Sequence, residues 1–177
     1  FGGVSGAHLN PAITIGMLSI RRIKPAPAIV YVAAQLLGGF AAYYLFTYFI
    51  NQTYGNVGQF EGRILVAEAA GAFVLSIGWA AAIYQRLETS KAAAIIGLSL
   101  VLGLIVSAAG AGGIINPAVA LGAKSWVLGT YVLGPVLGAI IGFNLYSLLF
   151  APAPELAREA KEEAKAEKSE KSAKSKK

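Results

Sequence analysis

The chain has 177 residues, of which 56% are hydrophobic and only 14% are charged. Soluble domains usually carry about 25% charged residues, and no charge lies within residues 25–60, 92–123 or 125–154. Because a helix needs about 20 apolar residues to cross a bilayer, this pattern excludes an ordinary soluble enzyme and predicts an integral membrane protein.

Cysteine and histidine usage narrows the chemistry further. The sequence has no cysteine and a single histidine, His8, so disulfides, thiolate metal sites and cysteine nucleophiles are excluded. We therefore expect no metal site. The net charge of +6 does not indicate nucleic acid, because the charges gather at the ends of apolar runs and in the tail, a placement typical of the cytoplasmic side of a membrane protein.

Four apolar segments are long enough to span a bilayer, and two are too short. The spanning segments are Pro25–Ile50, Gly62–Tyr84, Lys91–Ala109 and Ser125–Phe150. The short ones are Asn10–Ile20 and Asn116–Ala123. About ten helical residues cover roughly 15 Å, half of the hydrocarbon core. The sequence thus predicts an all-α membrane protein with four full helices and two re-entrant half-helices.

The two short segments begin with the same motif. Asn10-Pro11-Ala12, preceded by a glycine-rich loop, recurs 106 residues later as Asn116-Pro117-Ala118. Interrupted helices at matching positions of two halves point to a substrate pathway, so we interpret the chain as an internal repeat. The second motif follows two spans and the first follows nine residues. Matching halves predict two further spanning helices, about 45 residues, upstream of this sequence.

Asparagine followed by proline suits the start of a half-helix. The asparagine oxygen caps free N–H groups of the first turn, and proline at the next position has no N–H that needs a partner. The asparagine NH₂ group would then point outward as a pair of donors. Two such helix starts meeting at the midplane would offer donors to a neutral molecule, and their positive ends would oppose cations.

Charge placement predicts the orientation. Residues 20–24, 85–91 and the tail, placed on one face, hold 13 of the 15 Lys and Arg residues, and Arg63 and Lys124 lie opposite. Positive charge favours the cytoplasm. We therefore expect a channel domain over residues 1–150 and a cytoplasmic tail over residues 151–177, helical or disordered, with nucleic-acid or anionic-lipid contact as a minor alternative.

The motif and its surroundings resemble the aquaporin and glycerol-facilitator family, the major intrinsic proteins. Ser5-Gly-Ala-His-Leu-Asn10-Pro-Ala-Ile-Thr14 is similar to that family's first signature loop. The resemblance continues through Tyr31 and Gln35, Glu68 and the second motif to Gly134-Pro135 and Gly138, and it covers about residues 2–150. It implies six tilted helices and two half-helices around a pore in each subunit of a homotetramer in the plasma membrane.

The resemblance also assigns candidate site residues. Asn10 and Asn116 match the paired pore asparagines of the two motifs. The loop carbonyls expected to line the pore belong to Gly6, Ala7, His8, Gly112, Gly113 and Ile114. Glu68, a carboxylate inside an apolar span, is expensive to bury. The resemblance implies a brace for the pore loop, and a proton-coupling acid is the alternative.

The chain departs from the family at the narrowest constriction. Three of its four positions align with Leu104, Gly113 and Val119, and Val119 stands where most members carry arginine. An apolar, wider filter is expected. The resulting hypothesis is a passive channel for water and small uncharged solutes such as glycerol or urea, and no enzyme. A secondary transporter with broken helices is the alternative, and a non-conducting scaffold ranks last.

Overall fold

The computed structural model describes residues 5–52 and 59–151, and every regular element within these ranges is helical. Along the chain the elements are α2 (Pro11–Ser19), α3 (Pro25–Ile50), α4 (Gly62–Tyr84), α5 (Thr89–Ala108), α6 (Pro117–Gly122), the π-helix η1 (Leu128–Leu133) and α7 (Gly134–Phe150). Four helices, with η1 and α7 taken as one, are long and apolar enough to cross a membrane. The expected all-α fold is confirmed, and the chain is that of a multi-pass membrane protein. The predicted tail lies outside the described residues from residue 152 onward.

Most helix boundaries match those expected to within one residue, and two differ by more for local reasons. α5 begins at Thr89 instead of Lys91, because its first turn is polar and an apolar run does not reveal it. The last span begins at Leu128 instead of Ser125. Lys124 is left-handed, with φ of 56°, and Val127 is extended, so no helix can run through this segment.

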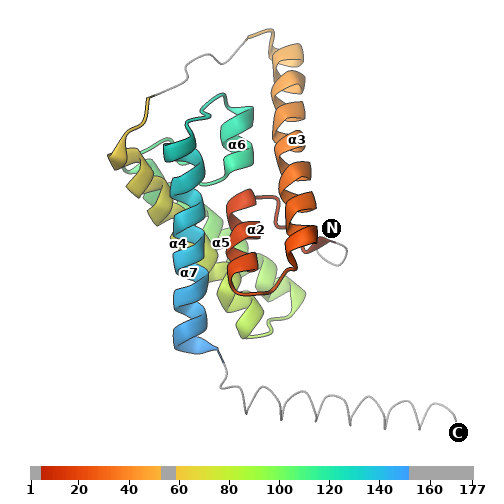
Figure 1. Cartoon of the computed structure of the whole chain (residues 1–177), viewed down its shortest axis with the longest axis vertical. Helices are drawn as coiled ribbons and strands as arrows, with labels where there is room; N and C mark the ends of the chain where they lie inside the picture. The colour runs from red at the N-terminus through yellow and green to blue at the C-terminus, as the bar shows by residue number, and fades with distance from the viewer. Residues whose placement is uncertain (1–4, 53–58, 152–177) are drawn as a thin grey trace, which may run out of the picture.

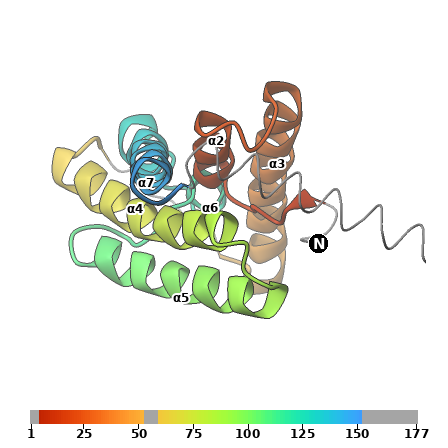
Figure 2. The ribbon, with the colours of Figure 1, turned by 90° about the horizontal axis from the view of Figure 1, so that it is seen from below.

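The long helices α4, α5 and α7 make close contacts at glycine residues. α4 lies between α7 and α5, as Figure 2 shows. A Cβ atom at Gly138 would lie 2.0 Å from the carbonyl oxygen of Ala69, and one at Gly71 would lie 2.4 Å from that of Gly103. Backbones this close require residues without a side chain, which is how membrane helices commonly associate.

Each half-helix packs mainly against one long helix. α2 packs against α7 and α6 packs against α3, and Figure 1 shows the two half-helices one above the other between these long helices. At the α3–α6 contact, a Cβ at Gly39 would lie 2.1 Å from the carbonyl oxygen of Ala118. Lys124, just after α6, places its Nζ 4.0 Å from the centre of the Tyr43 ring, a favourable cation–π contact.

The packing follows the internal repeat, except along one face of α3. The stripe Gly134, Gly138 and Gly142 of α7 is pressed against α4. α3 carries small residues with the same spacing, Ala34, Gly38 and Ala42, one hundred residues earlier, an offset six residues shorter than that of the two motifs. No atom lies within 4 Å of a Cβ built at Gly38. The stripe on α7 is therefore covered, and that on α3 is open.

Candidate functional site

The asparagines of the two motifs cap the two half-helices in the same way. Asn10 and Asn116 are both extended, with φ of −152° and −148°. The Oδ1 atom of Asn10 accepts from the N–H of Ala12, and that of Asn116 accepts from the N–H of Ala118, each at 2.9 Å. The proline after each asparagine occupies the first helical position, where a missing N–H costs nothing.

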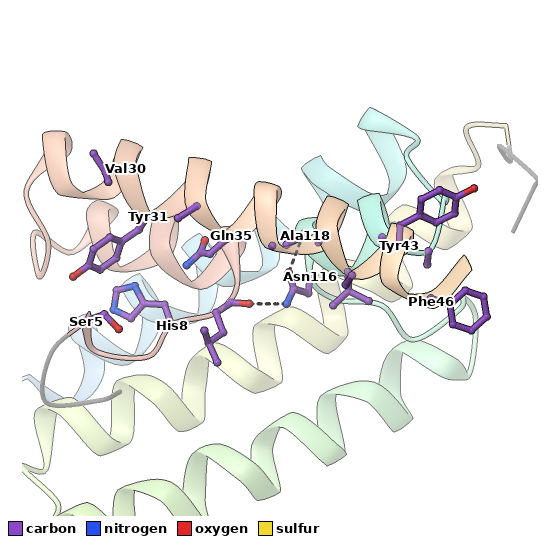
Figure 3. A pocket seen from close by; sticks show the side chains of 17 residues that line it. Ser5, His8, Val30, Tyr31, Gln35, Tyr43, Phe46, Asn116 and Ala118 are labelled. Atoms are coloured by element: carbon purple, nitrogen blue, oxygen red, sulfur yellow. Dashed lines mark hydrogen bonds between the residues drawn. The ribbon is translucent and has the colours of Figure 1, made fainter. Parts of the chain in front are cut away.

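The two caps are also bonded to each other's loop. Asn10 Nδ2 donates to the carbonyl oxygen of Ile115, and Asn116 Nδ2 donates to that of Leu9, each at 3.0 Å; Figure 3 shows the second bond. The sequence predicts that both N–H groups of each asparagine amide point outward, and this prediction is wrong for one of the two. One N–H of each amide is used by the opposite loop, and one remains for another acceptor.

Matching backbone turns present these carbonyls. Leu9 and Ile115 have positive φ angles of 51° and 44°, and Ala7 and Gly113, two residues earlier in each loop, have φ of 50° and 66°. Positive φ is uncommon for residues other than glycine and unusual for a β-branched residue such as Ile115. Backbone of this kind persists only where surrounding contacts hold it.

Glu68 supplies such contacts for the second loop. The carboxylate is fully buried, and its Oε1 atom accepts from the Ser107 hydroxyl at 2.9 Å and from the N–H of Ile114 at 3.0 Å. Its Oε2 atom accepts from the N–H of Ile115. Three donors thus converge on one charge, and α4 and α5 are tied to the strained loop beside Asn116.

In the first loop, His8 is held by a polar chain that reaches α3. Its Nδ1 atom lies 3.2 Å from the hydroxyl of Thr14, which also receives a hydrogen bond of 2.9 Å from Gln35 Nε2. The imidazole meets Tyr31 and Trp79 edge-on, with ring centres 5.8 Å and 5.6 Å away. Its orientation is therefore determined by α2, α3 and α4 together.

A cavity of about 800 Å³ runs between α3, α6 and the first loop. Its wall includes His8, Leu9, Asn116 and Val119, opposite the small-residue face of α3. Figure 3 shows His8, Gln35 and Asn116 following one another along it. The lining is mostly apolar, with a few polar groups, as small-molecule sites usually are.

The predicted pore carbonyls are available as acceptors. Within the described ranges, no protein donor bonds the backbone oxygens of the six loop residues expected to line the pore. The carbonyls consumed by the asparagines are instead the next ones along, those of Leu9 and Ile115.

The three filter positions are only partly brought together. The backbone oxygen of Leu104 would lie 3.2 Å from a Cβ at Gly113, so these two residues are neighbours. Val119 is half-exposed and lines the cavity along α3. The wall of this cavity does not include Leu104 or Gly113.

Sequence reasoning missed the acceptors Leu9 and Ile115 and the central hydroxyl of Thr14. A motif identifies side chains that can form hydrogen bonds, but every residue has a backbone carbonyl, so the sequence does not show which carbonyls will accept one. The carbonyls of Leu9 and Ile115 accept because these residues adopt left-handed turns. Thr14 stands within the signature loop, but its partner Gln35 comes from another helix, so their contact required the fold.

Comparison with known proteins shows that the chain is similar to membrane channels. Residues 1–146 match the family described as major intrinsic protein. Aquaporin-4 of Bos taurus is 32% identical over 181 residues, covering 92% of this chain and 55% of the relative. Aquaporin-4 of Homo sapiens is 30% identical over the same shares of both chains. Aquaporin AqpM of Methanothermobacter thermautotrophicus is 32% identical over 171 residues, 84% of this chain and 69% of the relative. The chain spans about half the length of the aquaporin-4 relatives.

Proposed function

Because the chain belongs to the major intrinsic protein family, we propose that it forms a passive transmembrane channel for water and small uncharged solutes, with no cofactor and no catalysed reaction. The observation that carries this proposal is the pair of half-helices whose asparagine caps bond to each other's loop. Each asparagine keeps one N–H, and within the described ranges no protein donor bonds the carbonyls of the six loop residues expected to line the pore. A neutral molecule that leaves its water shell would therefore find donors and acceptors in alternation.

The same site opposes cations mainly through backbone dipoles. The half-helices start with their positive ends at the two asparagines, and α6, with six residues, contributes less than α2, with nine. Val119 brings neither charge nor hydrogen-bond donor. We assign the filter to Leu104, Gly113 and Val119, and we propose that it is apolar and wide enough for glycerol or urea.

The open face of α3 fits the fold of a larger channel. A spanning helix packed on Ala34, Gly38 and Ala42, as α4 packs on the matching stripe of α7, would fill the α3 side of the cavity. The part beside His8, Leu9 and Asn116 would remain as the solute path. We assign this path to the two motifs and their loop carbonyls, with Glu68 bracing the second loop. Of these residues His8, Asn116 and Ala118 line the cavity, and Asn10 is joined to the second loop through the Ile115 carbonyl.

Location and assembly are further parts of the proposal. Lys and Arg gather at residues 20–24, 85–91 and in the tail, which supports a cytoplasmic tail in the plasma membrane by the positive-inside rule. Membership of a family of membrane channels supports a homotetramer surrounded by lipid. The division into a channel domain over residues 1–150 and a tail over 151–177 follows the same charge boundary.

Dependence of flux on the solute gradient tests the channel against the transporter. The complete protein, reconstituted in liposomes, should move water, glycerol and urea at rates that rise linearly with the gradient and do not respond to a proton or sodium gradient. Glu68 already accepts from three protein donors, which supports the brace over an exchanging acid. Saturable, ion-coupled uptake would contradict the channel and favour a transporter.

A further inference from the structure

The hydrogen bonds around Thr14 decide which nitrogen of His8 carries the proton. The Thr14 hydroxyl oxygen lies 3.1 Å from the carbonyl oxygen of Asn10, 2.9 Å from Gln35 Nε2 and 3.2 Å from His8 Nδ1. The Gln35 oxygen is farther away, at 3.4 Å. A hydroxyl donates one hydrogen bond and accepts two. Since a carbonyl only accepts and an amide nitrogen only donates, the role of His8 Nδ1 is the one left to assign.

Counting bonds separates the two tautomers of the neutral ring. With the proton on Nδ1, His8 donates to Thr14, Gln35 donates to Thr14, and Thr14 donates to Asn10, which makes three bonds. With the proton on Nε2, Thr14 must donate to Nδ1, and its oxygen then faces the Asn10 carbonyl with no proton between them. The Asn10 carbonyl then keeps only its bond from the Thr14 N–H at 3.0 Å. Because Thr14 is fully buried, water cannot replace the lost second bond. One hydrogen bond of ordinary net strength shifts such an equilibrium about fivefold.

The other ring nitrogen of His8 lies next to Gly6. A Cβ atom at Gly6 would lie 3.1 Å from Nε2, so a side chain at this position would crowd that edge of the ring. Within the described part of the chain, Nε2 has no protein hydrogen-bond partner. His8 also lines the cavity, as Asn116 does, and Figure 3 shows Gln35 between them along the cavity.

We propose that Thr14 and Gln35 hold His8 as the Nδ1–H tautomer, so that its unprotonated Nε2 faces the cavity as a fixed hydrogen-bond acceptor. The molecules it would contact are neutral solutes that carry O–H or N–H donors, water included. Thr14 and Gln35 are positioning residues that act through His8. The contribution to permeation rests on the proposed channel function, whereas the tautomer itself does not.

Nitrogen-15 NMR measures the tautomer directly. The complete protein, labelled with ¹⁵N-histidine and reconstituted in lipid bilayers, is recorded well above the usual histidine pKa of about 6.5. The difference from a His8→Asn spectrum isolates the signals of this ring. We expect a protonated Nδ1 and an unprotonated Nε2 in the major form. A major form protonated at Nε2, or equal populations of the two tautomers, would overturn the proposal.

Two variants of Thr14 test the cause. Thr14→Val removes the hydroxyl, and the ratio of Nδ1–H to Nε2–H should fall about fivefold or more. Thr14→Ser keeps the hydroxyl and should retain the wild-type ratio, as should Ser76→Ala, which removes a hydroxyl that bonds only within α4. An unchanged ratio in Thr14→Val would contradict the assignment. Absent solute flux together with the expected tautomer would instead count against the channel function alone.

Discussion

At the scale of single residues, the site depends on groups that hold other groups in place. Glu68 touches neither motif asparagine, yet it holds the N–H groups of Ile114 and Ile115. These bonds keep Ile115 in the left-handed turn from which its carbonyl meets Asn10. A buried carboxylate with three donors is a stable arrangement, and the loss of its charge or of one acceptor atom would leave donors facing each other.

Replacement of Glu68 by glutamine tests this brace. The amide would turn one acceptor atom into a donor that faces N–H groups in a fully buried site, at a cost of about 1–3 kcal/mol. We expect a lower melting temperature of the purified protein in detergent and a lower permeability per inserted copy. Glu61→Gln is the matched control, because Glu61 is exposed and, among the described residues, pairs only with Arg63. Equal stability of both variants would contradict the brace.

Replacement of Val119 by arginine tests which solutes the channel admits. Val119→Arg would add a fixed charge and several N–H donors to a half-exposed position on the cavity wall. Wild-type liposomes should pass water, glycerol and urea, and the arginine variant should suppress glycerol and urea more than water. A wild-type protein that passes water and excludes both larger solutes would show that the filter is narrow. Very low water flux would instead indicate a hydrophobic constriction that stays dry.

At the scale of helices, α6 is positioned against α3 by a backbone contact that admits no side chain. α6 approaches α3 at Gly39 and is also held by Lys124 over Tyr43. A shift of α6 would move Asn116 away from Leu9, since the cap and the cross-bond belong to the same side chain. The α3–α6 contact therefore controls half of the site.

Gly39→Ala tests this contact. The added methyl would lie 2.1 Å from a backbone oxygen of Ala118, and backbone cannot yield as a flexible side chain does, so we expect a loss of about 1–3 kcal/mol of stability. Gly97→Ala, on α5, is the control, because nothing lies within 4 Å of its Cβ. Thermal unfolding of the two purified variants gives the comparison. A Gly39→Ala protein as stable as the control would mean that α6 can pack against α3 in another position.

Much of the helix pattern could be predicted, because bilayer length and charge gaps determine where apolar helices begin and end. α3 and α4 match their expected bounds for this reason. The half-helices were predictable from the repeated Asn-Pro motif. The start of the last span was not, since the left-handed Lys124 and the π-helix at Leu128 leave no mark in hydropathy. Nor was the pairing of Thr14 with Gln35, which depends on how α2 meets α3.

At the scale of the molecule, the two halves repeat one architecture and differ at one face. α7 is covered by α4, whereas the equivalent face of α3 is open and apolar. An open apolar helix face in a membrane protein is covered either by lipid or by another helix. The match of small residues at a spacing of one hundred favours a helix.

Gly38→Leu distinguishes lipid from a helix on α3. Against lipid, the leucine at this open position costs little, because nothing lies within 4 Å of the Cβ. Against a helix packed as α4 packs on Gly138, it would force the two backbones apart. We expect the variant of the complete protein to unfold at a lower temperature than Gly97→Leu, which serves as the control. Equal melting temperatures would show that lipid covers the face.

The central claim is that the two asparagine caps form the solute path, and osmotic swelling tests it most directly. Asn10→Ala and Asn116→Ala each remove a cap worth about 1 kcal/mol and a donor to the opposite loop. Asn144→Ala is the control, because this asparagine bonds Ser19 and its own helix and belongs to neither motif. With complete protein at equal abundance in liposomes, both cap variants should lose water permeability while the control keeps it. Unchanged permeability in both cap variants would contradict the account.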